Sequence, residues 1–548
     1  MKTSIRFLFF AICICISFST KAADTVSIHE TQIPILIERH DNVLFYLRLT
    51  AKTTHVLNDV VITFGNATKL KEINSIKLYY GGTEAYQSYS KSRFAPVDYL
   101  SFTEPNNTLA ANLSYSILRA VITSPTQRTI TLKGNQTLFP GVNYFWVSLQ
   151  MQPDASLSSK VTAQINSVTL DGEKANIDIV SPKNIEHRMG KGLRHAGDND
   201  AKVYRIPGLT TSNSGALLAV YDIRYNNGND LQEYINIGFS KSNNKGNTWG
   251  KMRIPLAFGE NGGLPSAQNG VGDPCILYDT KTNTIWIAAV WMHGMGHQVS
   301  WFSSQQGMDP NLTGQLVLTK STDEGKTWSE PVSVVPQFKN PSWRLLLQGP
   351  GKGITMQDGT LVFPIQFIDS ASLPHSAIMY SKDHGEHWSF HQPARDNTTE
   401  AQVAEIEPGV LMLNMRDNRG GSRAVAITKD LGKTWIEHPS SRKALPESVC
   451  MASLLHVPAN ENIYNKDILL FSNPSTTKGR HHITIKASFD EGITWPIENQ
   501  LLLDEGNGWG YSCLTMIDKE TIGILYESSV AEITFQTIKL KDVINKTY

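Results

Sequence analysis

Short apolar runs separated by polar, glycine-containing turns recur along almost the whole chain of 548 residues. Residues 361–363, 424–427 and 483–485 are examples, and each run is the length of a single β-strand. Stretches with the 3.6-residue apolar spacing of an amphipathic helix are scarce. The pattern therefore predicts an all-β protein.

One turn sequence occurs five times after residue 240, with the pattern Ser/Thr-x-Asp-x-Gly-x-x-Trp. Asn244 replaces the aspartate of the first copy, and His387 replaces the usual threonine of the third. The aspartate can accept backbone N–H bonds across a tight turn, and the glycine can take the positive φ that such a turn needs. The Thr-Trp that follows favours a new strand with a large apolar anchor. The copies are 242–249, 321–328, 381–388, 428–435 and 488–495.

The spacing of these turns indicates the kind of array. Their central positions 244, 323, 383, 430 and 490 are 79, 60, 47 and 60 residues apart. A propeller blade of four short strands needs about 40–50 residues, and the surplus can form loops. We therefore predict a six-bladed β-propeller over residues 185–548, in which the repeats have a structural role.

The preceding region, residues 23–184, contains no copy of the repeat. It is rich in Thr, Ser, Val and Ile and has strand-like runs, so we expect a β-sandwich of about eight strands. A polar, glycine-containing stretch at 181–192 is the expected boundary. The runs are 33–37, 43–47, 60–64 and 143–147.

Residues 1–22 have the layout of a secretory signal peptide, with a short basic start, an apolar stretch and small residues before position 23. We therefore expect a periplasmic or secreted protein. Over the whole chain 50 basic and 50 acidic side chains balance, which disfavours nucleic acid or an anionic membrane as a partner. Cys275, Cys450 and Cys513 are too few for a disulfide framework, and no set of residues has the spacing of metal ligands.

Arg205 lies inside an apolar run, Val-Tyr-Arg-Ile-Pro-Gly-Leu at 203–209, where a charge should be paired or directed at a ligand. This segment resembles the Phe/Tyr-Arg-Ile-Pro motif of sialidases, and the five turns resemble their Asp boxes. Over residues 186–548 the chain is similar to a bacterial exo-α-sialidase (neuraminidase) of the Asp-box glycoside hydrolases. The region before it resembles the β-sandwich that precedes this domain in enzymes of Bacteroidetes.

The resemblance implies a set of arginines for the substrate. Arg205 matches the first of three that hold the sialic acid carboxylate, Arg416 in Leu-Asn-Met-Arg-Asp matches the second, and Arg480 matches the third. Arginine suits this task because its planar guanidinium offers paired donors and stays charged. Arg224 resembles the additional arginine near O4 of the sugar.

The resemblance also implies the catalytic residues. Asp230, six residues after Arg224, matches the acid/base; Asp222 is the competing choice, although pairing with an arginine explains it as well. Glu400 matches the glutamate that activates the nucleophile, rather than Glu405, which strand alternation directs to the other face. Tyr511 matches the nucleophile, and a neutral phenol avoids the repulsion that a carboxylate would meet at a carbon already bearing one.

Three further expectations complete the site. Glu527 matches a glutamate that orients the first arginine, Asp273 matches a residue lining the pocket, and the chemistry requires no metal or cofactor. Trp301 could shape the pocket or pack within the fold. We expect sialylated glycans as partners and a monomer.

Two alternatives share much of this evidence. A trans-sialidase or an intramolecular, anhydro-sugar-forming enzyme would use the same residues, and a non-catalytic glycan-binding propeller would keep the repeats.

The first region could bind carbohydrate through aromatic residues such as Tyr86, Tyr89 and Phe94, or serve only as a structural spacer.

Overall fold

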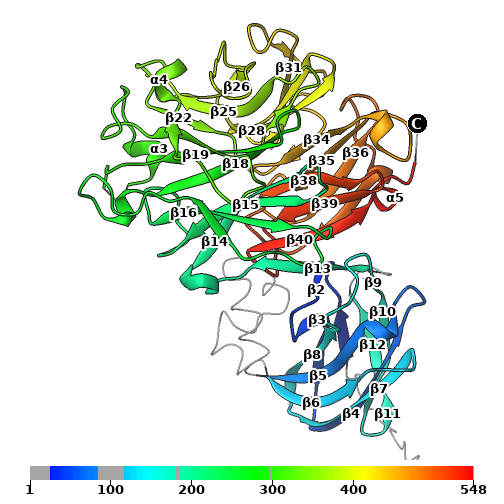
Figure 1. Cartoon of the computed structure of the whole chain (residues 1–548). Helices are drawn as coiled ribbons and strands as arrows, with labels where there is room; N and C mark the ends of the chain where they lie inside the picture. Colours follow the sequence, from blue (N-terminus) through cyan, green and yellow to red (C-terminus); the bar gives the residue numbers. More distant parts are fainter. Residues whose placement is uncertain (1–24, 84–115, 181–184, 297, 547–548) are drawn as a thin grey trace, which may run out of the picture.

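The computed structural model describes residues 25–83, 116–180, 185–296 and 298–546, and within them the protein is built from mostly antiparallel β-sheets (Figure 1). The α-helices of this part are single turns, which confirms the all-β prediction: α3 (Ser300–Ser303), α4 (Val335–Phe338) and α5 (Leu540–Val543). None of the described helices has the length and apolar character needed to cross a membrane. The predicted signal peptide and the aromatic candidates Tyr86, Tyr89 and Phe94 lie outside the described residues.

Two sheets make up the first region, with strand orders β12-β1-β3-β8-β5-β6 and β11-β10-β4-β7. Alternating side chains point into a shared core, as in β7, where Ile130 and Leu132 are buried and their neighbours are exposed. These ten strands exceed the eight expected, because β11 and β12 are too short to give a hydrophobic signal. Their bounds are β1 (Thr25–His29), β3 (Asn42–Ala51), β4 (His55–Phe64), β5 (Ile73–Thr83), β6 (Ile117–Thr123), β7 (Thr129–Leu138), β8 (Gly141–Met151), β10 (Ala163–Leu170), β11 (Glu173–Lys174) and β12 (Asn176–Ile179).

Six larger sheets follow, each made mainly from consecutive strands. The first contains β14 (Val203–Thr211), β15 (Leu217–Arg224), β16 (Ile235–Ser242) and β17 (Arg253–Leu256). The second contains β18 (Val271–Asp279), β19 (Thr284–Trp291), β20 (Gln315–Ser321), β21 (Val332–Ser333) and β23 (Gly351–Lys352). The third contains β22 (Leu345–Gln348), β24 (Ile354–Thr355), β25 (Leu361–Ile368), β26 (Pro374–Ser381) and β27 (Arg395–Asp396).

The remaining three sheets reach nearly to the end of the chain, and β30 (Gly421–Ser422) pairs with β33 (Pro446–Glu447) beside them. The fourth contains β28 (Thr398–Glu407), β29 (Val410–Asp417), β31 (Ala424–Thr428) and β32 (Ile436–Glu437). The fifth contains β34 (Ser453–Val457), β35 (Ile468–Pro474), β36 (Ile483–Ser488) and β37 (Gln500–Asp504). The sixth contains β38 (Ser512–Asp518), β39 (Thr521–Tyr526), β40 (Ile533–Lys539) and β13 (His187–Arg194), to which β2 (Ile35–Leu36) and β9 (Lys160–Val161) also pair.

Neighbouring sheets contact one another through their innermost strands. β14 contacts β18, β25 contacts β28, β28 contacts β34, and β34 contacts β38. The last sheet also meets the first, because β38 contacts β14. Strands from the start and the end of this region therefore lie side by side, which brings distant motifs together.

The repeated turns have the predicted hydrogen bonds. In the second copy, Asp323 accepts bonds from the backbone N–H of Thr327 at 2.9 Å and from its hydroxyl at 2.6 Å, and Ser321 accepts one from Gly325 N–H at 2.8 Å. Gly325 has φ +81°, and Glu324 before it has φ +58°, which the pattern did not predict. Trp328 packs edge-on against Phe239 of the preceding sheet, so the repeat joins sheets together.

Candidate functional site

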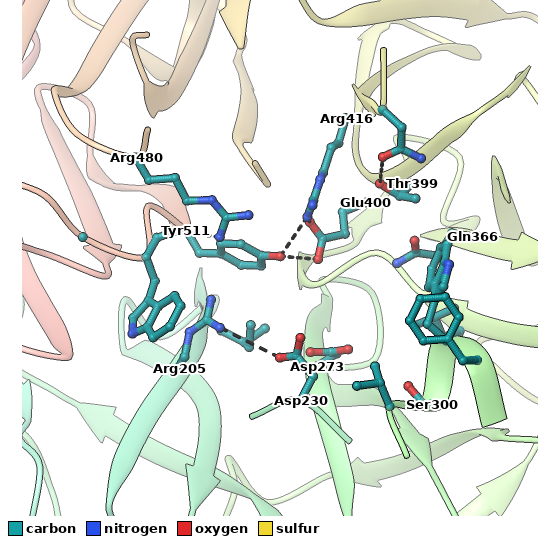
Figure 2. Close-up of a pocket in the computed structure, with 18 of the residues that line it drawn as sticks. Arg205, Asp230, Asp273, Ser300, Gln366, Thr399, Glu400, Arg416, Arg480 and Tyr511 are labelled. Carbon is teal, nitrogen blue, oxygen red and sulfur yellow. Dashed lines mark hydrogen bonds and ion pairs between the residues drawn. The ribbon is translucent and has the colours of Figure 1, made fainter. Parts of the chain in front are cut away.

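A cavity of about 920 Å³ opens where these inner strands meet, and the motif residues converge on it (Figure 2). Arg224 and Glu527 lie behind the lining and contact residues that form it. No residue of the five repeated turns lines the cavity. The predicted residues that do are Arg205, Asp230, Asp273, Glu400, Arg416, Arg480 and Tyr511.

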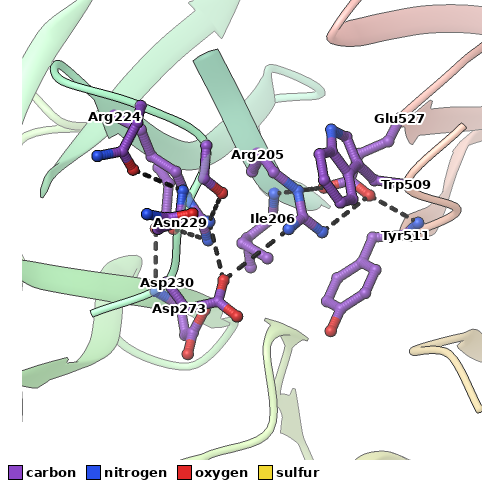
Figure 3. Close-up of polar contacts among 12 residues, drawn as sticks. Arg205, Ile206, Arg224, Asn229, Asp230, Asp273, Trp509, Tyr511 and Glu527 are labelled. Carbon is purple, nitrogen blue, oxygen red and sulfur yellow. Dashed lines mark hydrogen bonds and ion pairs between the residues drawn. The ribbon is translucent and has the colours of Figure 1, made fainter. Parts of the chain in front are cut away.

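Glu527 connects three parts of this site from a fully buried position (Figure 3). One carboxylate oxygen accepts bonds from Arg205 Nε at 3.0 Å and from the Ile206 backbone N–H at 2.9 Å. The other accepts the Tyr511 N–H at 3.0 Å and a longer bond from Arg205 at 3.4 Å. Burial disfavours a charged Arg205, yet Glu527 keeps the arginine pKa above its usual value.

Tyr511, Glu400 and Arg416 form a connected group on the cavity floor. The Tyr511 hydroxyl donates a short hydrogen bond to one oxygen of Glu400, and Arg416 donates to the other oxygen at 2.6 Å. The same Arg416 nitrogen lies 3.2 Å from the Tyr511 oxygen. Burial and the Glu400 charge raise the pKa of Tyr511 well above its usual value, so the site holds a neutral phenol beside Glu400.

Arg480 has hydrogen-bond partners of a different kind from those of Arg205 and Arg416. It donates to two backbone carbonyls, Trp509 at 3.0 Å and Val449 at 3.1 Å. Within the described parts of the chain, no carboxylate lies within 4.0 Å of its guanidinium. Its positive charge is therefore available to an anion in the cavity.

Asp230 stands at the cavity mouth with a side chain that is 62 % exposed. Arg224 donates to its Oδ1 at 2.8 Å, and an Arg205 nitrogen lies 3.9 Å away. Burial acts to raise the pKa of this carboxyl, but the Arg224 and Arg205 charges outweigh it and lower the pKa. Asp222, the competing acid, is fully buried against Arg224 and does not line the cavity.

Asp273 lies close to Asp230 in the cavity wall and has a positive φ of +60°. Its N–H donates to Asp222 at 2.9 Å, which fixes its position at the second sheet. Burial and the neighbouring carboxylates of Asp222 and Asp230 raise its pKa well above the usual value. A neutral carboxylic acid here can donate a hydrogen bond as well as accept one.

Several lining residues were not predicted from the sequence to belong to the site. The Trp509 ring lies over Arg205, 4.3 Å from its guanidinium carbon, and holds it by a cation–π contact. The sequence feature that could have indicated Trp509 as a site residue is its position two residues before Tyr511. Trp301, considered from the sequence, does line the cavity. The other unpredicted residues are Ile206, Val299, Ser300, Phe302, Leu347, Gln366, Thr399, Asn418, Asn507 and Gly508.

The described residues contain no cluster of three or more His, Cys, Asp or Glu side chains that could hold a metal ion. Cys275, Cys450 and Cys513 are buried free thiols.

Comparisons with known proteins agree with this geometry. Residues 23–174 match the model of the N-terminal domain of BNR-repeat neuraminidase, and residues 206–527 match that of a BNR repeat-like domain. A sialidase of Bacteroides fragilis is 66% identical over 543 residues, 99% of each chain. A sialidase of Paraclostridium sordellii is 32% identical, covering 60% of this chain and 82% of its own. The solved structure of a Hadza microbial sialidase matches with a TM-score of 0.88 and 54% identity, over 94% of this chain and all of that one.

Proposed function

Because the chain belongs to the BNR-repeat neuraminidases and is an exo-α-sialidase, a glycoside hydrolase, we propose that it releases terminal α-linked sialic acids with retention of configuration. The substrates are sialylated glycoproteins, glycolipids and oligosaccharides. The observation that carries the proposal is the contact of Tyr511 with Glu400 beneath three convergent arginines. A phenol paired with a base is a nucleophile ready for activation.

The arginines bind the sugar's carboxylate. Arg480 brings an uncompensated charge, whereas Arg205 and Arg416 are each oriented by a glutamate, Glu527 and Glu400. Three guanidiniums in a largely desolvated cavity provide charge-assisted hydrogen bonds that neutral sugars cannot exploit. This selects the acidic sugar and sets its anomeric carbon above Tyr511.

The first chemical step forms a bond to the protein. The Tyr511 oxygen attacks the anomeric carbon while its proton passes to Glu400, and the glycosidic C–O bond breaks. Asp230 protonates the departing oxygen. The carboxylate of the bound sugar partly neutralises Arg205, which weakens one of the charges that lower the Asp230 pKa and favours the protonated acid.

The second step restores the enzyme. Water attacks the anomeric carbon and gives a proton to Asp230, while the Tyr511 oxygen leaves and recovers its proton from Glu400. Two displacements at one carbon give net retention. Arg224 holds Asp230 in place, and the neutral Asp273 offers a hydrogen bond to a sugar hydroxyl.

We also propose that the six sheets are the blades of a β-propeller over residues 185–548. The contact of β38 with β14 and the pairing of β13 with β40 support this closure. Residues 23–184 are proposed as a separate β-sandwich, and residues 1–22 as a signal peptide that directs export to the periplasm or beyond.

Proton NMR of the purified protein with 3′-sialyllactose tests the reaction. Early release of α-sialic acid that later mutarotates is expected, and initial release of the β-anomer would contradict retention. An anhydro-sugar or a transferred sialoside would keep the site but change the named reaction. Tyr511→Phe should lose most turnover while still folding, and Tyr464→Phe, which removes a hydroxyl outside the cavity, is the matched control.

A further inference from the structure

A second cavity, of about 490 Å³, lies beside the cavity that contains Tyr511, which we call the reactive cavity. The two cavities share the side chain of Phe302. This volume is within the range of about 300–1,000 Å³ that is usual for small-molecule sites. Its lining contains no acidic side chain and is mostly polar: Met295, Gln298, Phe302, Ser303, Gln305, Asn311 and Arg344. None of these residues except Phe302 lines the cavity around Tyr511.

The segment 298–303, which contains the short helix α3, forms the wall between the two cavities. Val299 and Ser300 line the reactive cavity, whereas Gln298 and Ser303 line the second. Phe302 belongs to both, and 71 % of it is exposed. An aromatic ring this exposed offers a flat apolar surface to a ligand.

The position of α3 is tied to the acid. Ser300 N–H donates to the carbonyl of Leu231 at 2.6 Å, and Gln232 N–H donates to the carbonyl of Gln298 at 3.3 Å. Both contacts involve the residues that directly follow Asp230. In Figure 2, Ser300 lies on the same side of the reactive cavity as Asp230 and Asp273, away from Arg480.

The chemistry then gives the direction of the leaving group. Asp230 protonates the glycosidic oxygen, so the sugar attached to that oxygen must leave past Asp230 and the α3 segment bonded to it. On this path the next sugars of the same chain would reach Phe302, which lines both cavities. The second cavity is the space that lies beyond this ring.

Arg344 adds a polar anchor in that space. One of its nitrogens donates to Ser372 Oγ at 2.7 Å and another to the Phe302 carbonyl at 2.9 Å. Across the described residues, no carboxylate lies within 4.0 Å of its guanidinium. The remaining N–H donors can therefore bind sugar oxygens, and the cavity amides of Gln298, Gln305 and Asn311 can do the same.

We propose that this second cavity is a subsite for the second and following sugars of an oligosaccharide leaving group. Phe302 stacks on a sugar face, and Arg344 with the neighbouring amides binds its hydroxyls. The proposal rests on the proposed function and deepens it: the preferred substrates are sialylated oligosaccharides rather than sialic acid on a single sugar.

The test compares kcat/KM for two substrates, sialyl-galactose and a sialylated tetrasaccharide with the same linkage. Wild-type protein should favour the longer one. Gln305→Trp fills only the second cavity, so it should lower kcat/KM for the tetrasaccharide about tenfold and leave sialyl-galactose unchanged. Phe302→Ala should reduce the longer substrate more than the shorter one.

Ile497→Ala is the matched control, because Ile497 is 76 % exposed and lines neither cavity. Equal values for both substrates in wild-type protein, or equal losses in Gln305→Trp, would overturn the subsite. If wild-type protein released no sialic acid even from sialyl-galactose, the proposed function itself would fail. The two failures are therefore distinguishable.

Discussion

Replacing Glu527 by glutamine tests how far one buried carboxylate organises the site. Glutamine has the same shape but one acceptor oxygen, and its NH₂ group cannot accept a bond. The carboxylate accepts two bonds at each oxygen, so the NH₂ group must face donors on one side. The less costly orientation places it toward Tyr511 N–H and the longer Arg205 bond.

The expected loss of stability follows from these contacts. An unsatisfied backbone N–H of Tyr511 costs about 1–3 kcal/mol, and a buried Arg205 without its counter-charge brings the total to about 3–5 kcal/mol. Arg205 and Tyr511 would both shift, and a displacement near 1 Å can lower kcat/KM by about 100-fold.

Thermal unfolding and steady-state kinetics measure both effects. Glu520→Gln is the matched control, because Glu520 forms an exposed ion pair with Lys539 that should contribute less than about 1 kcal/mol. If Glu527→Gln unfolded at the wild-type temperature and kept wild-type kcat/KM, Glu527 would not be the organiser of the site.

Three further predictions follow from other contacts. Arg480→Ala should raise KM about 10- to 100-fold in kinetic assays, and an unchanged KM would remove it from carboxylate binding. Burial raises the pKa of Asp504 from 3.8 to about 6, so its contribution to stability is present below pH 4 and is lost as the pH rises through 6. The stability of wild-type protein relative to Asp504→Asn should therefore fall by about 3 kcal/mol over this range, and a pH-independent difference in chemical denaturation would contradict the assignment. Gly325→Ala should cost about 2–4 kcal/mol with kcat unchanged, because φ is +81° and a Cβ would lie 2.5 Å from the Phe239 ring; unaltered unfolding would refute this.

Seven residues of the lining could be predicted because each lies in a short motif of its own. Arg205, Arg416 and Tyr511 lie in or beside apolar runs. Burying a polar side chain there costs free energy unless it is paired or directed at a ligand. The resemblance of their motifs to those of sialidases suggested their chemistry, and the structure brings them to one cavity. Their roles in turnover remain predictions that the experiments above address.

Other features depend on contacts that no local pattern contains. Glu527 is 322 residues from Arg205, and their pairing was expected only from the resemblance to sialidases, because no local pattern around either residue specifies it. The α3 wall was missed because Val299 to Phe302 follow no strand or helix period. The positive φ of Glu324 escaped prediction because only the glycine after it has a residue preference for that conformation.

The bond between Glu527 and Arg205 also has a consequence for biosynthesis. Arg205 lies on the first inner strand and Glu527 directly follows β39, so a ribosome must translate nearly the whole chain before the two can meet. A nascent or truncated chain that stops before residue 527 has Arg205 without its counter-charge and the Tyr511 backbone N–H without the carboxylate that accepts it. Under the mechanism proposed above, cleavage of sialic acid therefore requires translation through residue 527.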